Sequence, residues 1–599
     1  MKEQIQKRVE ALRELMSREG LDAFIIPSFD QHLSEYTPEV WQHRQWISGF
    51  YGSAGTVVVT HKGAYLWTDS RYYLQAASDL EGTPFSLMKE GMPDTPGIVE
   101  FLRNEGSVKK VGLFGRSVSA KEALTTRRGL SVAGIDLVTD TDLAGELIGN
   151  EKQIPLNPLF AQPLDLAGKS TKEKIKEVRE ALKAEGANTI PLTMLDEVAW
   201  LFNVRGTDVE YNPVGIAYGL ITPDEVFFYA FPEKVPAELR TELERSDVQI
   251  RPYGQIYDDI KALPKSAVVW TDPLRTNYAL YASIPDGITK IEASSPITLL
   301  KAQKNEAEYA GCVKVMHRDG VALTRFFIWL EKTLKEGGTP TEHDLDEKLA
   351  SFRAKGEGYV SDSFATIAGY KDHGAIVHYH ATPDIAYKVR REGMLLLDSG
   401  AQYHDGTTDI TRTISLDGKP TEGQKHDYTN VLKGHIGIAT AIFPEGTRGS
   451  QLDVLARRFL WQEGKLYTHG TGHGVGHFLN VHEGPQNIRL EENSTPLMPG
   501  MVTSNEPGYY LEGQYGIRIE NLVRTVFKMR GADDPIDFYG FETLTLCYLD
   551  NNLVNVSMLT DDELEWYNAY QERVFKELSP LLEKDESEWL RNKTLPLAR

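Results

Sequence analysis

Histidines and glycines alternate in one stretch of the chain, residues 467–485, which reads Y-T-H-G-T-G-H-G-V-G-H-F-L-N-V-H-E-G-P. Its histidines are His469, His473, His477 and His482. The first two have the i, i+4 spacing of a zinc-binding helix, but Gly470 and Gly472 disfavour a helix there. No Glu follows His469, as the H-E-x-x-H motif requires. The glycines indicate a backbone that passes close to another group, so we interpret the stretch as part of a site rather than as core histidines.

Two aspartates flank a predicted hairpin in residues 394–416, M-L-L-L-D-S-G-A-Q-Y-H-D-G-T-T-D-I-T-R-T-I-S-L. Asp405-Gly406 is a turn signal between apolar-rich runs, so Asp398 and Asp409 on the two arms are expected near each other. The register of the arms is left open. Asp398 follows four apolar residues, and a carboxylate at the end of a buried strand is costly unless it is paired or binds a metal. The competing interpretation is an aspartate that caps a turn.

Two glutamates have similar settings further along the chain. Glu506 ends the strand-like run M-V-T-S-N-E, and in G-I-R-I-E-N alternation places Arg518 and Glu520 on one face. Asp398, Asp409, Glu506 and Glu520 would repel one another strongly if they met without cations. Two divalent ions would balance their four charges. Carboxylates with one imidazole suit Mn²⁺ best, with Co²⁺, Zn²⁺ or Fe²⁺ as alternatives.

These motifs, in this order and spacing, resemble the aminopeptidase P branch of the creatinase/prolidase ("pita-bread") metallopeptidases. The resemblance rests on D-S-G-A-x-x-x-D-G-T-T-D-I-T-R-T, H-G-T-G-H-G-V-G, V-H-E-G-P, E-P-G-Y-Y and G-I-R-I-E-N, within residues 362–524. A weaker similarity covers W-x-S-G-F-Y-G-S-A-G-T and W-T-D-S-R-Y-Y near the N-terminus and T-L-C in the tail. The longer pattern is similar to the three-domain members of that branch.

The resemblance implies a role for each matching position. It makes the metal ligands Asp398, Asp409, His473, Glu506 and Glu520, with Asp409 and Glu520 bridging two ions. It makes His378, His469 and His482 substrate-contacting residues, and we expect Arg518 to bind substrate as well. As a ligand and nearby carboxylate, Glu506 is the expected proton shuttle, and His378 and His482 are the other expected catalytic residues. His380 and His477 are additional to the family pattern. Alternation would place His380 on the same face as His378, and we interpret His477 as supporting or structural.

The elements that must position these residues follow from the apolar pattern. A helix is predicted over Gln4–Arg18, a strand over Ala23–Ile26 and a hairpin from Gly55–Thr60 and Ala64–Thr68. The capping box Ser170–Glu173 then starts a second helix and strand in the same order. We predict a duplicated α/β domain with the proline-rich stretch 154–163 as linker.

The pattern changes near residue 300. We predict a long helix over Lys301–Lys335, then strands rich in Gly, His and Asp, a strand-like run at Leu544–Leu549 and a helix that opens at Thr560. The apolar face of that last helix is either core or a dimer contact. The expected fold class is α/β (α+β): domain I over 1–153, a related domain II over 154–299, and a catalytic pita-bread domain over 300–599 with an extension from about 533.

Composition narrows the setting of the protein. The chain has 599 residues and a net charge of −21, which argues against a nucleic-acid partner. Two cysteines are too few for a disulfide framework, and no apolar run reaches the length of about 20 residues that spans a bilayer. The N-terminal apolar stripe is helical rather than signal-like. We expect a cytoplasmic protein with no nucleic-acid or membrane partner.

The expected activity is release of the N-terminal residue from peptides that have proline in the second position, with a homodimer as the expected assembly. An Xaa-Pro dipeptidase of the prolidase type is the alternative enzyme. A catalytically inactive pita-bread protein that serves as a binding module is the alternative from another class, although all five ligand positions are intact. Metal-dependent hydrolysis of peptides of different length separates these readings.

Overall fold

The computed structural model describes residues 2–532 and 535–599 of the chain, which divides into two compact units. The first unit comprises Met1–Gln162 and Lys169–Ile297, and the second comprises Pro163–Gly168 and Thr298–Arg599. The expected start of the C-terminal extension, near residue 533, falls outside the described residues. Among the described residues, no helix is both long and apolar enough to cross a membrane.

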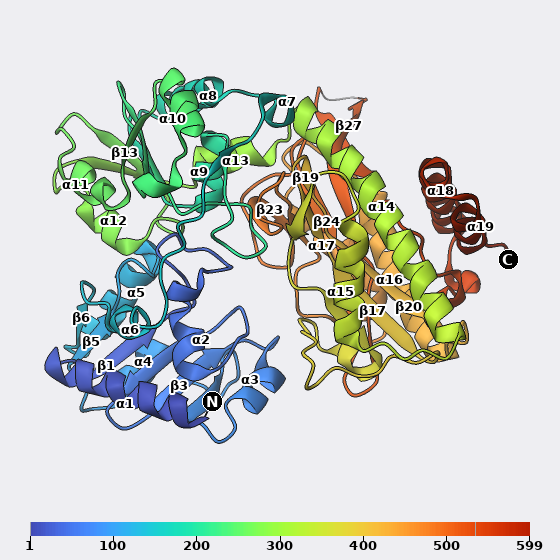
Figure 1. Cartoon of the computed structure of the whole chain (residues 1–599), viewed down its shortest axis with the longest axis horizontal. Helices are drawn as coiled ribbons and strands as arrows, with labels where there is room; N and C mark the ends of the chain where they lie inside the picture. The colour runs from blue at the N-terminus through green and yellow to red at the C-terminus, as the bar shows by residue number, and fades with distance from the viewer. Residues whose placement is uncertain (1, 533–534) are drawn as a thin grey trace. The chain divides into compact units, whose positions relative to one another are not determined.

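The first unit begins with the predicted amphipathic helix α1 (Lys2–Arg18), whose apolar stripe is buried against a sheet (Figure 1). The predicted strand is β1 (Ala23–Ile26), and the predicted hairpin is β2 (Thr56–Thr60) with β3 (Ala64–Thr68). The strand order is β4-β3-β2-β1-β5-β6, completed by β4 (Phe85–Lys89), β5 (Lys110–Leu113) and β6 (Asp136–Val138). The accompanying helices are α2 (His43–Ser48), α3 (Tyr73–Asp79), α4 (Ile98–Asn104), α5 (Ala120–Ser131) and α6 (Leu143–Ile148).

The second half of this unit repeats the same order, so the predicted duplication is confirmed. Helix α8 (Thr171–Ala184) opens with the predicted capping box of Ser170 and Glu173. The antiparallel run β1-β2-β3 is matched by β8 (Ile190–Leu192), β10 (Tyr218–Ile221) and β11 (Val226–Ala230). In the first half, β4 pairs in parallel with β3, and β5 and β6 continue in parallel from β1. In the second half, β12 (Gln249–Pro252) pairs in parallel with β11 in the same way. The parallel strands β13 (Val268–Thr271) and β14 (Thr289–Glu292) correspond to β5 and β6, and a parallel bridge at Thr189 joins β13 to the start of β8.

The second unit contains the long helix α14 (Glu306–Lys335), which starts later than the prediction of Lys301 (Figure 1). Helix α13 (Pro296–Ala302) ends first, and Asn305 then caps α14. The Asn305 side chain accepts from the backbone N–H groups of Ala307 and Glu308, and Glu308 accepts in return from the Asn305 N–H. Because this capping box satisfies N–H groups that a helix start leaves without partners, the helix begins there.

The strands of this unit form short sheets joined by helices α15 (Glu342–Arg353), α16 (Glu422–Ala439) and α17 (Gly449–Trp461). One sheet has the order β16-β17-β20, from β16 (Ile367–Tyr370), β17 (Met394–Ser399) and β20 (Ile410–Ser415). Another has β15 (Tyr359–Asp362), β18 (Ala401–Tyr403) and β19 (Gly406–Thr407), the last two being the predicted hairpin at Asp405-Gly406. A larger sheet runs β21 (Ile442–Pro444), β28 (Asp537–Thr543), β27 (Asn521–Arg530), β24 (Val502–Asn505), β22 (Gly472–Gly474) and β23 (Glu483–Ile488), and β25 (Gly508–Leu511) pairs with β26 (Tyr515–Arg518).

The C-terminal region differs from the prediction in one element. Residues 544–549 are buried but belong to no strand. The guanidinium of Arg412 bonds the carbonyl oxygens of Cys547 and Tyr548, each at 2.9 Å, and Gln571 accepts from the Leu549 N–H. Because side chains satisfy this backbone in place of a neighbouring strand, the apolar run at 544–549 is a buried irregular segment.

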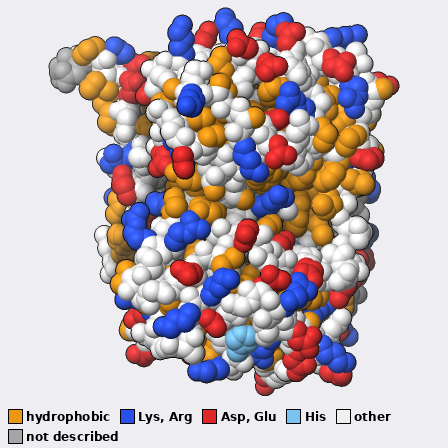
Figure 2. Space-filling model, turned by 90° about the vertical axis from the view of Figure 1, so that its left-hand side faces the viewer, with side chains coloured by type: hydrophobic (Ala, Val, Ile, Leu, Met, Phe, Trp, Pro, Cys, Tyr) orange, Lys and Arg blue, Asp and Glu red, His pale blue; other side chains and the backbone are white. Residues whose placement is uncertain are grey.

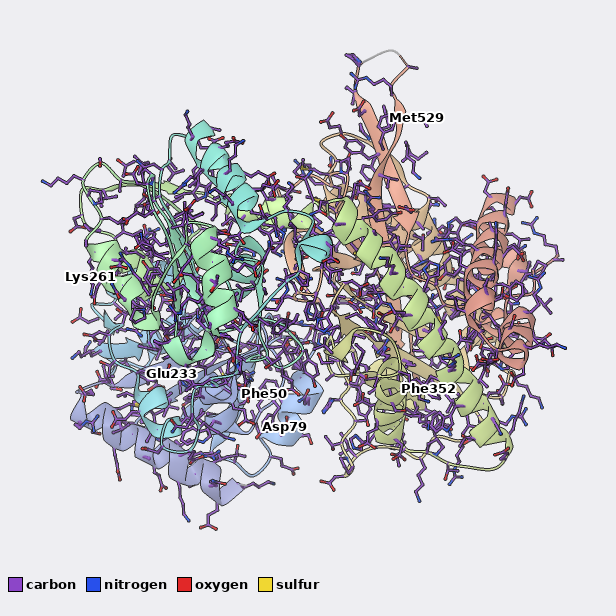
Figure 3. The ribbon with its side chains drawn as sticks, turned by 45° about the horizontal axis from the view of Figure 1, so that its top comes forward. Phe50, Asp79, Glu233, Lys261, Phe352 and Met529 are labelled. Carbon is purple, nitrogen blue, oxygen red and sulfur yellow. The ribbon has the colours of Figure 1, made fainter. Side chains whose placement is uncertain are left out.

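Helix α18 (Asp561–Leu578) opens with the predicted capping box of Thr560 and Glu563. Its residues Tyr567, Tyr570, Val574 and Leu578 are buried in the core of this unit. Of the two interpretations of that face, core packing is therefore confirmed and the dimer contact is wrong. In contrast, the hairpin of β27 and β28 projects outward, with the exposed Met529 near its end (Figure 3).

The surface carries charges of both signs. Figure 2 shows one face, on which Lys and Arg side chains are interspersed with Asp and Glu side chains rather than gathered in a basic stripe.

Candidate metal centre

The two aspartates lie close together at a pair of adjacent antiparallel strands, β17 and β20, as the hairpin prediction required. Asp398 is in β17 opposite Thr411 of β20, and Asp409 stands directly before β20. Both aspartates are buried. The β17 residues are buried throughout, so the Asp398 carboxylate emerges from an apolar strand.

The two glutamates reach the same place from neighbouring strand ends. Glu506 follows β24, and its backbone N–H donates to the Thr471 carbonyl at 2.8 Å. Glu520 lies between β26 and β27, where the Thr411 hydroxyl donates to its carboxylate at 2.8 Å. Thr411, opposite Asp398, therefore links that glutamate to the aspartate strands.

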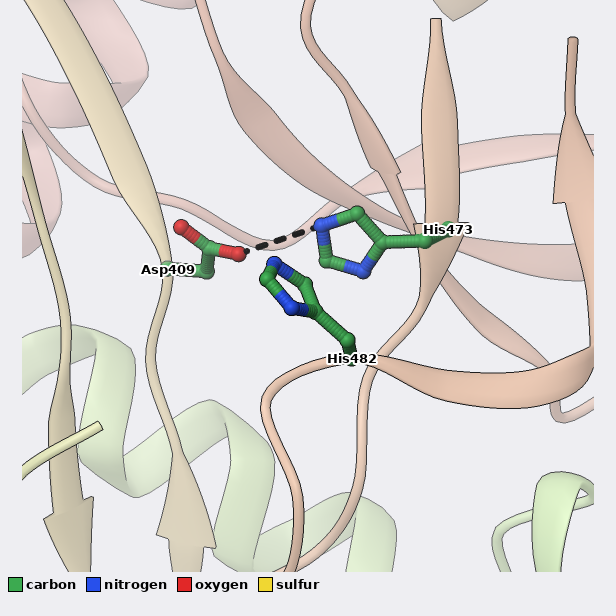
Figure 4. Close-up of side chains that lie close together, drawn as sticks. All are labelled: Asp409, His473 and His482. Atoms are coloured by element: carbon green, nitrogen blue, oxygen red, sulfur yellow. Dashed lines mark ion pairs between the residues drawn. The ribbon is translucent and has the colours of Figure 1, made fainter. Parts of the chain in front are cut away.

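His473 lies in β22, and no helix forms across the His469–His473 spacing, as predicted. Its Nε2 is 3.4 Å from Asp409 Oδ2 (Figure 4). The same nitrogen is 3.4 Å from Glu506 Oε1. A Cβ at Gly472 would lie 1.9 Å from the Ser504 carbonyl oxygen. The glycine therefore lets β22 approach β24, which brings His473 to the carboxylates.

The ligand atoms fall into overlapping groups whose members lie within 4.8 Å of one another. One group is Asp398, Asp409 and Glu520, and a second is His473, Glu506 and Glu520. A third joins Asp409 and His473 to His482, whose ring is 4.4 Å from that of His473 (Figure 4). Glu520, Asp409 and His473 each occur in two groups. Of these, Glu520 and Asp409 are carboxylates, whose two oxygens could be shared between two ions.

The electrostatics of the cluster favour a bound cation. Burial raises the pKa of Asp398 above the ordinary range, although the charge of Arg518 lowers it. Burial likewise raises the pKa of Glu506, although the charge of His473 lowers it. Burial and the neighbouring carboxylates together raise the pKa of Glu520 well above its ordinary value. Asp398 Oδ1 and Glu520 Oε1 are buried without a hydrogen-bond partner. Carboxylate oxygens held this way suit hard divalent ions, so the residues fit a metal centre.

The neighbouring carboxylates also favour the protonated form of His473. Although burial and His482 lower it, hydrogen bonding to Asp409 and the charges of Glu506 and Asp409 raise the pKa of His473 above its ordinary value. A cation would take the place of that proton, since the nitrogen already faces both carboxylates. The His473 Nδ1 is bonded to the Gly474 carbonyl at 2.9 Å, which leaves Nε2 directed at the cluster.

The segment with His378 and His380 is not a strand, so the expectation that alternation places both on one face is wrong. A 3-10 helix, η4 (Lys371–Ala375), precedes a turn at Val377–His378. His378 is half-buried and close enough to His469 to lower its pKa, whereas His380 is exposed. The period of two applies only to extended chain, and a turn breaks it.

His469 and Arg518 share a tyrosine that the sequence analysis did not single out. The Tyr510 hydroxyl is 2.8 Å from His469 Nε2 and accepts from Arg518 Nη1 at 2.6 Å. Arg518 also donates to Asp398 Oδ2 at 2.6 Å and is almost fully buried. Its expected contact with substrate stays a prediction, with these two donors engaged inside the protein. Tyr510 lies in E-P-G-Y-Y, so membership of that motif was the available signal.

The remaining histidine of the glycine-rich stretch lies elsewhere. His477 is buried, and its Nε2 would be 2.7 Å from a Cβ at Gly311 of α14. It belongs to none of the ligand groups among the described residues. Its position against α14 is consistent with the structural interpretation.

The fold and the donor set together define a metallopeptidase of the pita-bread class. Two creatinase/prolidase N-terminal domain families match residues 8–141 and 150–308, metallopeptidase family M24 matches 312–525, and the C-terminal region of peptidase M24 matches 537–597. The chain belongs to the Xaa-Pro aminopeptidase P group of the M24 creatinase/prolidase family.

Relatives of full length support that assignment. A probable Xaa-Pro aminopeptidase P of Coprinopsis cinerea is 43% identical over 99% of this chain and 98% of its own length. Xaa-Pro aminopeptidase 1 of Dictyostelium discoideum is 39% identical over 99% of this chain and 97% of its own. The crystal structure of X-prolyl aminopeptidase from Caenorhabditis elegans, described as a cytosolic enzyme with a di-nuclear active site, has a TM-score of 0.94 at 35% identity and covers 99% of this chain and 100% of that one.

Proposed function

We propose that this chain is an Xaa-Pro aminopeptidase, which hydrolyses the bond between the N-terminal residue of a peptide and a proline in the second position. One observation carries the proposal: four carboxylates and one imidazole converge in overlapping groups, and two of their buried oxygens have no hydrogen-bond partner. The relatives that match the whole chain bear the name of this activity.

The proposed ligands are Asp398, Asp409, His473, Glu506 and Glu520, which hold two divalent ions. Asp409 and Glu520 would be shared between the two ions, in keeping with their places in two ligand groups each and with the two oxygens of each carboxylate. Mn²⁺ is the proposed metal because the donors are mostly carboxylate oxygens, with Co²⁺ or Zn²⁺ as alternatives. When bound, the ions supply Lewis acidity and lower the pKa of a bound water so that hydroxide is available at neutral pH.

The protein's own side chains complete the chemistry. Glu506 is the proposed shuttle that passes a proton to the leaving nitrogen of proline, since its carboxylate faces the cluster, 3.4 Å from His473 Nε2. The proposed role of His378 and His482 is to donate to the substrate carbonyl as negative charge develops on its oxygen. His469, whose pKa burial lowers to about 3, offers a neutral imidazole for contact with substrate.

Substrate choice follows from the bond that is cut. An Xaa-Pro bond is a tertiary amide without an N–H, so the site needs no acceptor at that position. Xaa-Pro-Yaa peptides should therefore be cleaved in the presence of Mn²⁺, and Xaa-Ala-Yaa peptides should be largely uncut. An acetylated N-terminus should also block cleavage, because a free amino group is expected to fill a position in the metal centre. Cleavage of the acetylated peptide or of the alanine analogue at a comparable kcat/KM would contradict the proposal.

Two alternatives remain distinguishable. A prolidase-type enzyme would cut Xaa-Pro dipeptides in preference to longer peptides, whereas the doubled N-terminal domain and the full-length relatives favour action on longer chains. A catalytically inactive binding protein would bind Xaa-Pro peptides without hydrolysing them when loaded with metal. Comparing an Xaa-Pro dipeptide with an Xaa-Pro-Yaa tripeptide separates all three.

The proposed setting is the cytoplasm, and the proposed assembly is a homodimer. The Caenorhabditis elegans enzyme is described as cytosolic, which supports the first of these. Sedimentation equilibrium of the purified chain, whose mass is 67.2 kDa, tests the second: a species of a single chain mass across the concentration range would contradict it.

A further inference from the structure

Glu342 is a buried carboxylate, fully enclosed in the protein, that the chemistry above does not use. It is the first residue of α15, directly after the cap residue Thr341. A helix N-terminus stabilises a nearby negative charge. The position therefore lowers the cost of an ionised side chain there, but it does not explain what the side chain is for.

The hydrogen bonds of Glu342 all come from one segment, residues 370–387. Its Oε1 accepts from the backbone N–H of Tyr370 at 2.8 Å, and its Oε2 accepts from the backbone N–H of Tyr387 at 2.7 Å. The Tyr379 hydroxyl donates to Oε2 at 2.8 Å, and His373 Nδ1 donates at 2.9 Å. Every partner is a donor, which a carboxylate can satisfy with both oxygens and an amide cannot.

His378 lies in the middle of that segment, next to Tyr379 in the chain. The described residues 376–387 contain no helix or strand, so no ladder of backbone hydrogen bonds sets their path. The ring of His373 lies 3.6 Å from that of Tyr387 and 4.4 Å from that of Tyr379. One carboxylate thus gathers both ends and the centre of the loop that presents His378.

The other side of the segment is held by close backbone packing. A Cβ at Gly516 of β26 would lie 1.7 Å from the carbonyl oxygen of Gly374 in η4, and a Cβ at Gly369 would lie 2.6 Å from the Gly374 Cα. The loop is therefore pressed against the strand that leads to Arg518 and Glu520. The segment is thus held by Glu342 on one side and by this close backbone packing on the other.

We propose that Glu342 is a positioning residue, which acts through His378 by fixing the conformation of residues 370–387. The inference rests on the proposed function, because it assigns Glu342 to the reaction in which His378 contacts substrate. A residue that misplaces a catalytic group by about 1 Å can cost on the order of 100-fold in rate. The effect of losing Glu342 should thus appear in kcat, while the metal ligands, which Glu342 does not touch, keep their metal.

The test is the variant Glu342→Gln, which keeps the shape of the side chain but turns one acceptor into a donor facing donors. We expect kcat for an Xaa-Pro-Yaa peptide to fall on the order of 10- to 100-fold, with KM changed less than kcat and two metal ions retained. Tyr387→Phe is the matched control, because its hydroxyl contacts Asp372 rather than Glu342 and its backbone N–H is unchanged. It should cleave at nearly the wild-type rate.

A double-mutant cycle distinguishes positioning from general stabilisation. In a His378→Ala background, Glu342→Gln should cause little further loss, since the residue through which it acts is gone. An equal fall in both backgrounds would overturn the inference, as would wild-type kcat in a folded Glu342→Gln protein. Absence of turnover by the wild-type enzyme would instead refute the proposed function. If Glu342→Gln does not fold, Tyr379→Phe carries the same cycle, with an expected fall of about 10-fold in the wild-type background only.

Discussion

Two buried sites, one in each unit, hold charge in opposite ways. In the first unit, Lys234 pairs with Asp208, and both side chains are completely buried. In the second unit, the four carboxylates of the candidate centre face one permanent cation, Arg518, and one histidine. The pair is balanced within the protein, whereas the cluster carries an excess of negative charge that the protein does not neutralise. Balance indicates a structural role, and imbalance in a buried site indicates that a cation from outside belongs there.

The largest expected effect comes from removing a carboxylate of the cluster. Asp398→Ala should lose metal and lower turnover by at least about 1,000-fold, because the loss of Lewis acidity costs several kcal/mol of transition-state stabilisation. Elemental analysis and peptide hydrolysis measure both quantities. The matched variant Asp208→Asn in the first unit should keep metal and turnover. An active Asp398→Ala protein with full metal content would contradict the claim that the unbalanced carboxylates bind the metal.

The histidines around the cluster should separate into two kinds. His473→Ala should lower the metal content, because its Nε2 faces two carboxylates at 3.4 Å. His378→Ala and His482→Ala should keep their metal and lose turnover, by about 100-fold or more. His482 is the sharper case, since it lies within reach of Asp409 and His473. Equal metal loss in all three variants would show that these roles are wrongly divided.

Substitutions in the balanced pair of the first unit, Asp208 and Lys234, should change the free energy of unfolding and leave the metal content unchanged. Asp208→Asn leaves Lys234 buried without a counter-ion, which should destabilise this unit by about 3–5 kcal/mol. Replacing both residues by apolar side chains, Asp208→Leu with Lys234→Met, should recover most of that loss. Unit-resolved hydrogen exchange measures the effect. A double variant no more stable than the single one would mean that the pair contributes more than charge balance.

The smallest effect concerns pH in the first unit. Burial lowers the pKa of His32 to about 3, and its ring nitrogens are bonded to the Thr193 carbonyl and the Tyr253 hydroxyl. The unfolded chain, with an ordinary histidine pKa near 6.5, binds the proton more readily. The stability that His32 contributes is therefore present above about pH 6.5 and is lost as pH falls toward 3. By pH 5 the loss should be about 2 kcal/mol.

The variant His32→Gln isolates this contribution. Asp30, whose pKa burial raises to about 6, acts in the opposite direction but is common to both proteins. The difference in unfolding free energy between wild type and variant should shrink as pH falls from 7 to 5. A difference that is constant over this range would show that His32 binds protons equally readily in the folded and the unfolded chain.

The sequence predicts regular elements well where pattern and capping agree. Helix α1, strand β1 and the capping boxes of α8 and α18 lie where apolar spacing and Ser170 or Thr560 placed them. The predicted start of α14 was wrong because the apolar pattern continues across the break between α13 and α14, where Asn305 caps the new helix. The strand predicted at 544–549 was wrong because Arg412, far away in the chain, donates to the carbonyl groups of Cys547 and Tyr548, so these need no neighbouring strand.

The site shows the same division between local and distant information. Asp398 and Asp409 could be brought together from the sequence, since one turn separates them. The position of His378 relative to His380 could not be predicted from the sequence, because it depends on a turn in the segment that Glu342 holds. A glutamate at the first position of a helix looks like an ordinary charged surface residue, and only the folded chain shows that it is enclosed by four donors.

The most direct test of the account is the activity of metal-free protein as Mn²⁺ is added back in measured amounts. If the unbalanced carboxylate cluster is a centre for two ions, hydrolysis of an Xaa-Pro-Yaa peptide should begin near zero and reach its plateau at two bound ions per chain. The Asp208→Asn protein should follow the same curve, because its altered charge lies in the first unit. Full hydrolysis by protein that contains no metal and resists chelators would contradict the account.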